Sequence, residues 1–334
     1  MSMVNLLAGD VGGTTTRLGL FERTSSRPRP VAMRSFATLD FPNLPAIISA
    51  FLEINGANAP IESACFGVAG PVADGVADLT NVPWSVEAAD VERVFKIPRV
   101  KLLNDLEALA YAVPVLRESE VHVLQAGRAD DDGNIAIIAA GTGLGEALLQ
   151  KVDGRYVALA SEAGHADFAA RTDRDIMLLR HLVRRYGRAQ VEDVLSGRGL
   201  VDIHMVCHAG PCEAGVDLGA LAAPADISAA ALDGRCGVCV KTLELFVEAY
   251  GAEAGNLALR TMATGGVFVG GGIAPKILAA LTTGAFMSAF RAKAPFEAML
   301  GAVPVKVILN SDAGVLGAAN YCSQILRTDG WGVS

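Results

Sequence analysis

The chain has 334 residues, 51% of them hydrophobic, with 36 glycines and a formal net charge of −8. This length is sufficient for two medium-sized domains, each with its own core. The 28 basic residues are scattered along the chain, which argues against a nucleic-acid surface, and no uninterrupted apolar run is long enough to predict a membrane span.

The start of the chain and its cysteines indicate the compartment. A strand-like run begins at Val4, and the six cysteines have no regular disulfide-like spacing. We therefore expect no signal peptide, reduced thiols and a cytoplasmic location. The abundance of glycine and the low aromatic content favour an α/β enzyme with many tight turns.

Two segments share a pattern of two apolar runs around a turn rich in glycine and threonine. The first is VNLLAGDVGGTTTRLGLF at residues 4–21, and the second is NIAIIAAGTGLGEALLQ at residues 134–150. Each pattern predicts a β-hairpin. The repetition indicates an internal structural duplication, which favours two related α/β halves with a cleft between them.

Between the two hairpins the pattern predicts two strands and a helix. The strands are expected at Glu62–Ala69 and Val100–Leu103. The second strand ends at Asn104–Asp105, and the Leu-, Ala- and Glu-rich run Leu106–Ala112 predicts a helix with Asp105 near its N-cap.

The part after the second hairpin is predominantly helical, and Cys207–Pro224 is expected to be a surface loop. A glycine turn follows a strand at Gly266–Gly272. Further strands are expected at Tyr156–Ala160 and Val305–Leu309, and helices at Arg174–Tyr186, Val191–Leu195, 227–264, Pro275–Leu281 and Ala313–Leu326.

Three glycine-rich turns each follow a predicted strand: Asp10–Thr15, Gly141–Gly145 and Gly270–Gly272. Glycine allows backbone N–H groups to approach a phosphate closely, and threonine hydroxyl groups add donors. One such turn is usually only a hairpin turn, but three in succession indicate a nucleotide site. The chain has neither a P-loop nor a G-x-G-x-x-G turn that leads into a helix.

Asp10 is the acidic residue of the first turn. Its carboxylate could hold Mg²⁺, directly or through water, or it could close the turn with its own side chain.

Six motifs resemble those of bacterial glucokinases and occur in the same order. They are GDVGGTTTRLGLF, LLNDLEALAYAVP, GTGLGEALL, SEAGHADF, VLSGRGL and GGVFVGGGIAPK. The resemblance extends from about residue 4 to about residue 325 and is specific because of the combination of motifs. It implies membership of the sugar kinase, Hsp70 and actin superfamily.

The resemblance implies a two-domain actin-like ATPase fold of the ribonuclease H-like type, each domain having a mixed sheet flanked by helices. We expect a smaller α/β domain at 1–115 plus 313–334 and a larger one at 116–312. The implied activity is transfer of the γ-phosphate of Mg-ATP to the 6-hydroxyl group of glucose, by a homodimer.

The resemblance also implies roles for individual residues. Asp105 matches the catalytic base and Asn104 a sugar ligand, although an ordinary N-cap is an equally good reading of Asp105 from the sequence alone. Glu162, His165 and Glu192 match sugar ligands, with a solvated helix carboxylate as the alternative for Glu192. The expected ATP-binding residues are Gly9, Asp10, Val11, Gly12, Gly13, Thr14, Thr15, Gly141, Thr142, Gly143, Gly271 and Gly272, and the expected Mg²⁺ residue is Asp10.

Two positions depart from the pattern of the family. Ala163 replaces a common glycine between Glu162 and His165, which puts the backbone geometry of that loop in question. Thr15 stands where the family often has asparagine. Asn81 and Trp84 are further candidates for the border of the sugar pocket, with core packing as the alternative for Trp84.

A group of soft ligands, His204, Cys207, Cys212, Cys236 and Cys239, raises the question of a zinc site. The 23 residues between Cys212 and Cys236 include an expected loop. We therefore expect Cys236 and Cys239 to lie on one helix face as small apolar residues.

The sequence leaves alternatives to glucokinase activity open. A broader hexokinase or a kinase for another hexose is the nearest alternative, and a non-catalytic sensor of ATP and sugar is an alternative of another class. A chaperone or filament protein of the same superfamily would have no reason to carry the Asn-Asp and Glu-x-x-His sets.

Overall fold

The computed structural model describes residues 5–55, 60–79, 82–208, 210 and 212–328. The chain divides into two compact units. The first contains Met1–Arg117, Tyr156–Ala160 and Asn310–Ser334, and the second contains Glu118–Arg155 and Ser161–Leu309.

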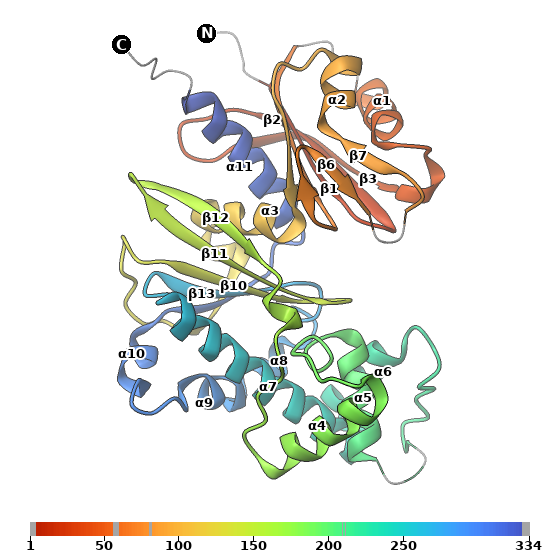
Figure 1. Ribbon diagram of the computed structural model, residues 1–334, viewed down its shortest axis with the longest axis vertical. Coiled ribbons are helices and arrows are strands. Elements are labelled where there is room, and N and C mark those ends of the chain that lie inside the picture. The colour runs from red at the N-terminus through yellow and green to blue at the C-terminus, as the bar shows by residue number, and fades with distance from the viewer. Residues whose placement is uncertain (1–4, 56–59, 80–81, 209, 211, 329–334) are drawn as a thin grey trace. The chain divides into compact units, whose positions relative to one another are not determined.

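The first unit is built on a five-stranded sheet in the order β3-β2-β1-β4-β8 (Figure 1). β1 and β2 form the antiparallel hairpin that the first glycine-rich turn predicts, whereas β4 and β8 continue the sheet in parallel. A three-stranded sheet has the order β5-β6-β7. The strands are β1 (Asn5–Val11), β2 (Thr15–Glu22), β3 (Arg29–Ala37), β4 (Ile61–Val68), β5 (Val72–Ala73), β6 (Val76–Asp78), β7 (Ser85–Glu87) and β8 (Val100–Asn104).

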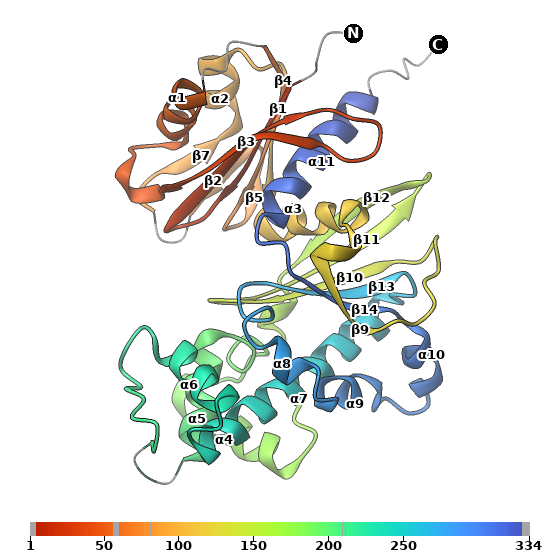
Figure 2. The same ribbon diagram turned by 180° about the vertical axis from the view of Figure 1, so that it is seen from behind.

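Helices cover both faces of the five-stranded sheet (Figures 1 and 2). On one face lie α1 (Leu44–Asn55) and α2 (Ala88–Phe95), and on the other α3 (Asp105–Ala112) and α11 (Ala313–Thr328). Nearly every residue of β1 is buried, as expected for a central strand with both faces covered.

The second unit is built on a six-stranded sheet in the order β12-β11-β10-β13-β14-β9. The antiparallel pair β10 and β11 is the second predicted hairpin, and β13 and β14 continue it in parallel. β9 closes the other edge antiparallel to β14. The strands are β9 (Val121–Gln125), β10 (Ile135–Ala140), β11 (Leu144–Val152), β12 (Arg155–Ser161), β13 (Gly266–Gly270) and β14 (Val305–Ile308).

The two large sheets have the same topology. β3-β2-β1-β4-β8 in one matches β12-β11-β10-β13-β14 in the other in strand order, and in both an antiparallel hairpin is continued by two parallel strands. This correspondence confirms the duplication predicted from the two hairpins, and β9 is the addition that distinguishes the second sheet.

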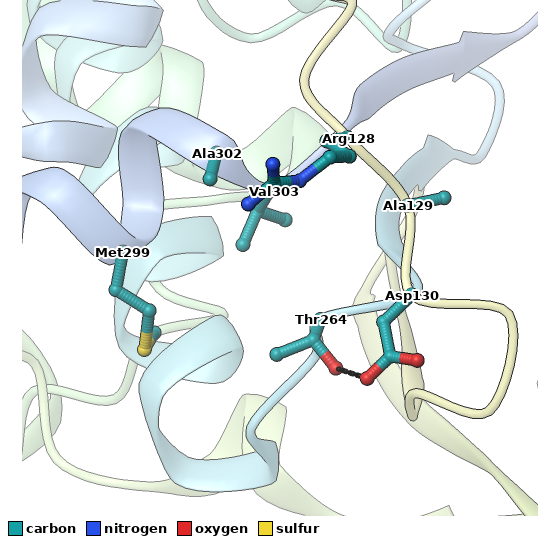
Figure 3. A pocket seen from close by; sticks show the side chains of 7 residues that line it. All are labelled: Arg128, Ala129, Asp130, Thr264, Met299, Ala302 and Val303. Atoms are coloured by element: carbon teal, nitrogen blue, oxygen red, sulfur yellow. Dashed lines mark hydrogen bonds between the residues drawn. The ribbon is translucent and has the colours of Figure 1, made fainter.

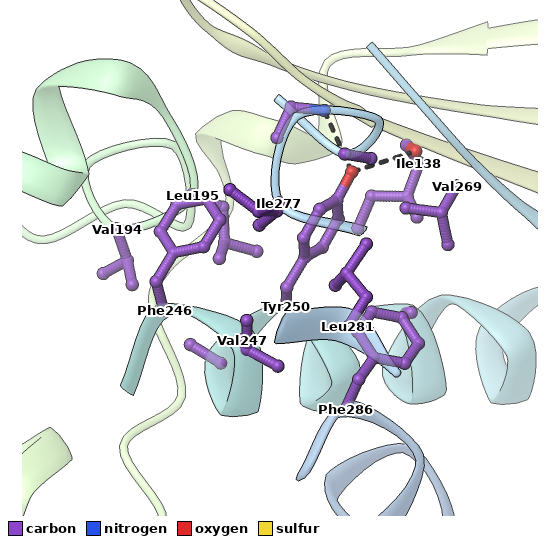
Figure 4. Packing of buried hydrophobic residues seen from close by; sticks show 14 of the residues in the cluster. Ile138, Val194, Leu195, Phe246, Val247, Tyr250, Val269, Ile277, Leu281 and Phe286 are labelled. Atoms are coloured by element: carbon purple, nitrogen blue, oxygen red, sulfur yellow. Dashed lines mark hydrogen bonds between the residues drawn. The ribbon is translucent and has the colours of Figure 1, made fainter. Parts of the chain in front are cut away.

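The core of the second unit surrounds the 25-residue helix α7. Tyr250 on this helix is fully buried, with ring centroids 5.9 Å from Phe246 and 5.7 Å from Phe286 (Figure 4). Burial of each such side chain contributes about 1.5–3 kcal/mol. The helices are α4 (Asp173–Tyr186), α5 (Gly197–Cys207), α6 (Ala223–Leu232), α7 (Gly237–Thr261), α8 (Leu278–Leu281), α9 (Ala285–Arg291) and α10 (Glu297–Ala302).

Most predicted elements are confirmed, but three helical predictions need correction. Residues 191–195 form a turn, 275–277 precede α8 instead of opening it, and the stretch 227–264 is two helices separated at Gly234, whose φ is +66°. Among the described residues, no helix is both long and apolar enough to cross a membrane.

Candidate active site

The first group of expected site residues lies where three parallel strands of the first unit end. In the sheet register Val11 pairs with Val68, and Val68 pairs with Asn104. The carboxyl ends of β1, β4 and β8 therefore share one edge of the sheet, which brings Asp10 near Asp105.

A capping box at the start of α3 fixes the position of Asp105. Asn104 Oδ1 accepts a hydrogen bond from Leu106 N at 3.0 Å, and Glu107 Oε2 accepts one from Asn104 N at 2.9 Å. Asn104 Nδ2 also donates to Gly70 O at 3.2 Å. Asn104 is thus the N-cap, and Asp105 is an exposed first residue of the helix, with Oδ1 2.8 Å from Leu106 N.

Asp10 lies in an electrostatically unfavourable place for a carboxylate. Burial, together with the neighbouring carboxylates of Asp105 and Asp312, raises its pKa to about 6 despite the opposing charge of Arg17. The start of α11 is adjacent, because a Cβ atom built on Gly314 would lie 3.2 Å from Asp10 Oδ2. A concentration of negative charge of this kind fits a divalent cation, which would offset it.

Among the described residues, Asp10 does not belong to a cluster of three or more metal-ligating side chains. In the part of the chain that the structure describes, groups of three or more metal-ligating side chains occur only elsewhere. This fits Mg²⁺ better than Ca²⁺, because Mg²⁺ commonly takes one or two carboxylates and completes its shell with water and phosphate oxygens.

The first glycine-rich turn is held by backbone and threonine hydrogen bonds. Gly12 N donates to Thr15 O at 3.1 Å, and Thr38 N donates to Thr14 O at 3.0 Å. Thr38 Oγ1 donates to Gly12 O at 2.8 Å. Gly9, Asp10 and Val11 belong to β1, Gly12 and Gly13 form the turn, and the side chains of Thr14 and Thr15 are exposed beside it. Thr38 gave no signal in the sequence pattern.

The second and third glycine-rich turns lie together at the ends of β10 and β13. These strands run parallel, with Ala139 opposite Gly270. Gly141 N donates to Gly143 O at 2.8 Å, which closes the first of the two turns around the exposed Thr142. Gly271 has φ +81°, and a Cβ atom there would lie 2.3 Å from Ala140 O, so this turn requires glycine. Gly272 follows it and is exposed.

Tyr250 supports both turns from the core. Its hydroxyl group accepts a hydrogen bond from Ala140 N at 3.1 Å and lies 3.3 Å from Gly270 O, the last residue of β13 (Figure 4). Burial raises the pKa of this phenol well above its usual value, so the hydroxyl group stays protonated. The sequence shows only a tyrosine in a helical pattern and does not reveal this support.

The structure brings Glu162 and His165 together in the second unit. Both side chains are exposed, and Glu162 Oε2 lies 3.9 Å from His165 Nε2. Gly164 packs so closely that a Cβ atom there would lie 2.2 Å from Leu144 O. Ala163 is not among the residues with positive φ, so its extra methyl group is compatible with the loop.

Gln190 is a residue that the sequence analysis missed. His165 Nδ1 lies 2.7 Å from Gln190 Oε1. Because an amide oxygen only accepts, this contact assigns the proton to Nδ1 and leaves Nε2 as an acceptor in the neutral ring. The only signal in the sequence is the proximity of Gln190 to Glu192.

Glu192 lies in the turn that the sequence analysis assigned to a helix. Its Oε2 accepts a hydrogen bond from Leu144 N at 2.9 Å, and its own N–H donates to Gly164 O at 2.8 Å. These bonds join it to the Gly141–Gly143 turn and to the Glu162–His165 loop. They also explain the wrong prediction, because tertiary hydrogen bonds at this position outweigh helical propensity.

The two remaining candidate residues, Asn81 and Trp84, and two cavities add nothing to the site. Asn81 lies outside the described residues, and Trp84 donates from Nε1 to Phe41 O at 3.2 Å as part of the core of the first unit. Two cavities, of about 280 and 470 Å³, lie in the second unit. Thr264 and Asp130, which are hydrogen-bonded to each other, line the smaller one (Figure 3). None of the expected site residues lines either cavity.

Comparison with known proteins connects these features to a family. The sequence profile of the family Glucokinase matches residues 7–325. A glucokinase of Nostoc punctiforme is 39% identical over 337 residues, which cover 95% of this chain and 98% of that relative.

Solved structures agree with this match. A glucokinase from an Antarctic psychrotroph superimposes with a TM-score of 0.86 at 31% identity, covering 96% of this chain and 99% of that one. A ROK family glucokinase from Streptomyces griseus, crystallised with glucose and AMPPNP, has a TM-score of 0.64 at 23% identity, covering 96% and 99%. The likeness confirms the expected actin-like ATPase fold.

Proposed function

This chain belongs to the glucokinase family, and we propose that it transfers the γ-phosphoryl group of ATP to the 6-hydroxyl group of glucose. The observation that carries the proposal is the position of Asp105, an exposed carboxylate on the first turn of α3, at the sheet edge that also carries Asp10. A base and a cation ligand at one edge are what phosphoryl transfer to an alcohol requires.

Asp105 is the general base in this proposal. It accepts the proton of the sugar 6-hydroxyl group as that oxygen bonds to the γ-phosphorus, while the bond from phosphorus to the β,γ-bridging oxygen breaks and ADP leaves. The proton then passes from the carboxyl group to solvent. The hydrogen bond from Leu106 N orients the carboxylate before the sugar arrives, which lowers the cost of reaching the reactive geometry.

Asn104 and three residues of the second unit are assigned to sugar hydroxyl groups. Asn104 Nδ2 has a second N–H group beyond the one that it donates to Gly70. His165 offers Nε2 as an acceptor, and Glu162 and Glu192 offer carboxylate oxygens. Polar groups of this kind discriminate between sugars, since an analogue without the matching hydroxyl group leaves them unpaired.

The glycine-rich turns are assigned to ATP. The backbone N–H groups of Gly9, Val11, Gly12, Gly13, Gly141, Gly143, Gly271 and Gly272 and the hydroxyl groups of Thr14, Thr15 and Thr142 are the proposed donors to phosphate oxygens. Asp10 is the proposed Mg²⁺ residue, through water. Bound Mg²⁺ would neutralise negative charge on the phosphates.

We further propose a cytoplasmic homodimer with the smaller domain at 1–115 plus 313–334 and the larger at 116–312. All six cysteines are free thiols in the structure, as a reducing compartment favours. The homodimer rests on membership of the family alone, and a sedimentation measurement of the purified chain tests it.

A coupled assay of ADP formation from Mg-ATP tests the proposed reaction. The acceptors are glucose, mannose, fructose and N-acetylglucosamine, with 6-deoxyglucose as the control that lacks only the reacting hydroxyl group. We expect turnover with glucose and none with 6-deoxyglucose. A preference for another hexose would correct the substrate, and no sugar-dependent ADP formation would refute the kinase activity.

A further inference from the structure

Three cysteine sulfur atoms converge in the second unit, away from the residues assigned to sugar and ATP. Cys212 Sγ lies 3.9 Å from Cys236 Sγ and 3.7 Å from Cys239 Sγ. Cys236 and Cys239 are buried at the start of α7, whereas Cys212 belongs to the segment that precedes α6. Cys236 is the N-cap of α7 and Cys239 is its third residue, so their buried side chains lie on the same side of the helix start, as expected.

These separations match those of a tetrahedral thiolate site. Zinc–sulfur bonds of about 2.3 Å at the tetrahedral angle place two sulfur atoms about 3.8 Å apart. All three sulfur atoms lie within 4.8 Å of one another, so one ion could contact them together. Cys236 is the N-cap residue of α7, and the N–H groups of the first helical turn favour a thiolate there.

His204 borders the three cysteines, with one of its ring nitrogen atoms within 4.8 Å of Cys212 Sγ. Its ring is buried, with Nδ1 4.0 Å from Cys239 Sγ and 3.2 Å from Thr242 Oγ1. Thr242 donates its own hydroxyl proton to Val238 O at 2.9 Å, so it accepts the Nδ1 proton of His204. The Nε2 atom then keeps its lone pair for a metal.

His208 provides an independent observation. Its ring centroid is 4.9 Å from that of His204, and its Nδ1 accepts a hydrogen bond from Gly210 N at 3.2 Å. The proton therefore resides on Nε2, which is buried and has no hydrogen-bond partner among the described residues. Nitrogen atoms of both rings and Cys212 Sγ lie within 4.8 Å of one another. A donor without an acceptor is costly unless a negative charge lies beside it.

We propose that Cys212, Cys236, Cys239 and His204 bind one Zn²⁺ ion. Three thiolates and a neutral imidazole leave a net charge of −1 on the complex, and the Nε2–H group of His208 then has a thiolate to which it can donate. Binding releases the thiol protons to solvent. The site joins the end of α5, the segment before α6 and the start of α7, so its role is structural.

The test is the zinc content of the full chain, measured by inductively coupled plasma mass spectrometry after gel filtration in metal-free buffer. We expect about one zinc per chain. Cys239→Ser should lose most of this zinc. Cys207→Ser is the matched control, because Cys207 lies in α5 nearby but in neither group of convergent ligands, and it should retain the metal.

A second measurement covers the case in which Cys239→Ser does not fold. The wild-type chain is stripped of metal and loaded with Co²⁺, and we expect the intense near-ultraviolet absorption of thiolate-to-cobalt charge transfer. A wild-type chain that binds neither metal would overturn the proposal. So would a Cys207→Ser variant that loses zinc as completely as Cys239→Ser, or a zinc-free chain in which two of these cysteines form a disulfide bond. None of these readouts depends on kinase activity.

Discussion

Glu146→Gln tests the electrostatics of the core of the second unit. Glu146 lies on β11 opposite Ile138, and its side chain is fully buried. Neither carboxylate oxygen has a hydrogen-bond partner among the described residues. Burial, together with the charge of Glu253, raises its pKa to about 8 despite the opposing charge of Arg260. The carboxyl group is therefore protonated at neutral pH in the folded chain and ionised in the unfolded chain.

The size and sign of the effect follow from this difference in protonation. Between its ordinary pKa of 4.5 and about 8, the folded state holds one proton more than the unfolded state, so stability falls as pH rises. The slope is at most about 1.4 kcal/mol per pH unit. Because glutamine stays neutral, we expect the free energy of unfolding of Glu146→Gln, relative to that of the wild type, to increase by about 2 kcal/mol from pH 5.5 to pH 7.

Urea unfolding followed by circular dichroism at several pH values measures this gain. Glu244→Gln, which removes an exposed carboxyl group of α7, is the matched control and should show no such gain. If the curves of wild type and Glu146→Gln stay parallel from pH 5.5 to pH 8, Glu146 does not carry the extra proton and the reasoning is refuted.

Three further predictions concern the site. Gly164→Ala should raise the KM for glucose and destabilise the fold by about 1–3 kcal/mol, because the new methyl group would collide with Leu144 O. Steady-state kinetics measures the first effect and thermal unfolding the second. Gln190→Ala should raise the KM for glucose up to about tenfold by freeing His165, with the KM for ATP unchanged. Asp10→Asn should raise the Mg²⁺ concentration needed for half-maximal activity about tenfold. In the wild type this concentration should also rise below about pH 6, because Asp10 then takes up a proton. A variant with an unchanged Mg²⁺ requirement would contradict the role of Asp10.

Local patterns predicted much of the fold. Both hairpins have glycine-rich turns between apolar runs, and their similarity predicted the shared topology of the two large sheets. The junction at Asn104–Asp105 was also predictable, because a strand that ends in Asn-Asp before a helix-forming run indicates a helix N-terminus.

Contacts between distant segments were not predictable in this way. Glu192 was assigned to a helix, but its bonds to Leu144 N and Gly164 O hold it in a turn. The bond from Ala140 N to the Tyr250 hydroxyl group, 110 residues along the chain, has no local signature. The same holds for Cys212 and Cys236, whose sulfur atoms meet although helix α6 lies between them in the chain.

The measurement that tests the proposed reaction most directly is the turnover of Asp105→Asn with glucose and Mg-ATP. Asparagine keeps an oxygen to accept the Leu106 N–H bond but cannot take up the proton of the 6-hydroxyl group. We expect kcat to fall about 10²–10⁴-fold, with an unchanged circular dichroism spectrum and little change in the KM for ATP. Asp90→Asn, a change of a partly exposed side chain of α2, should leave kcat unchanged. Near-normal turnover by Asp105→Asn would contradict the assignment of Asp105 as the base.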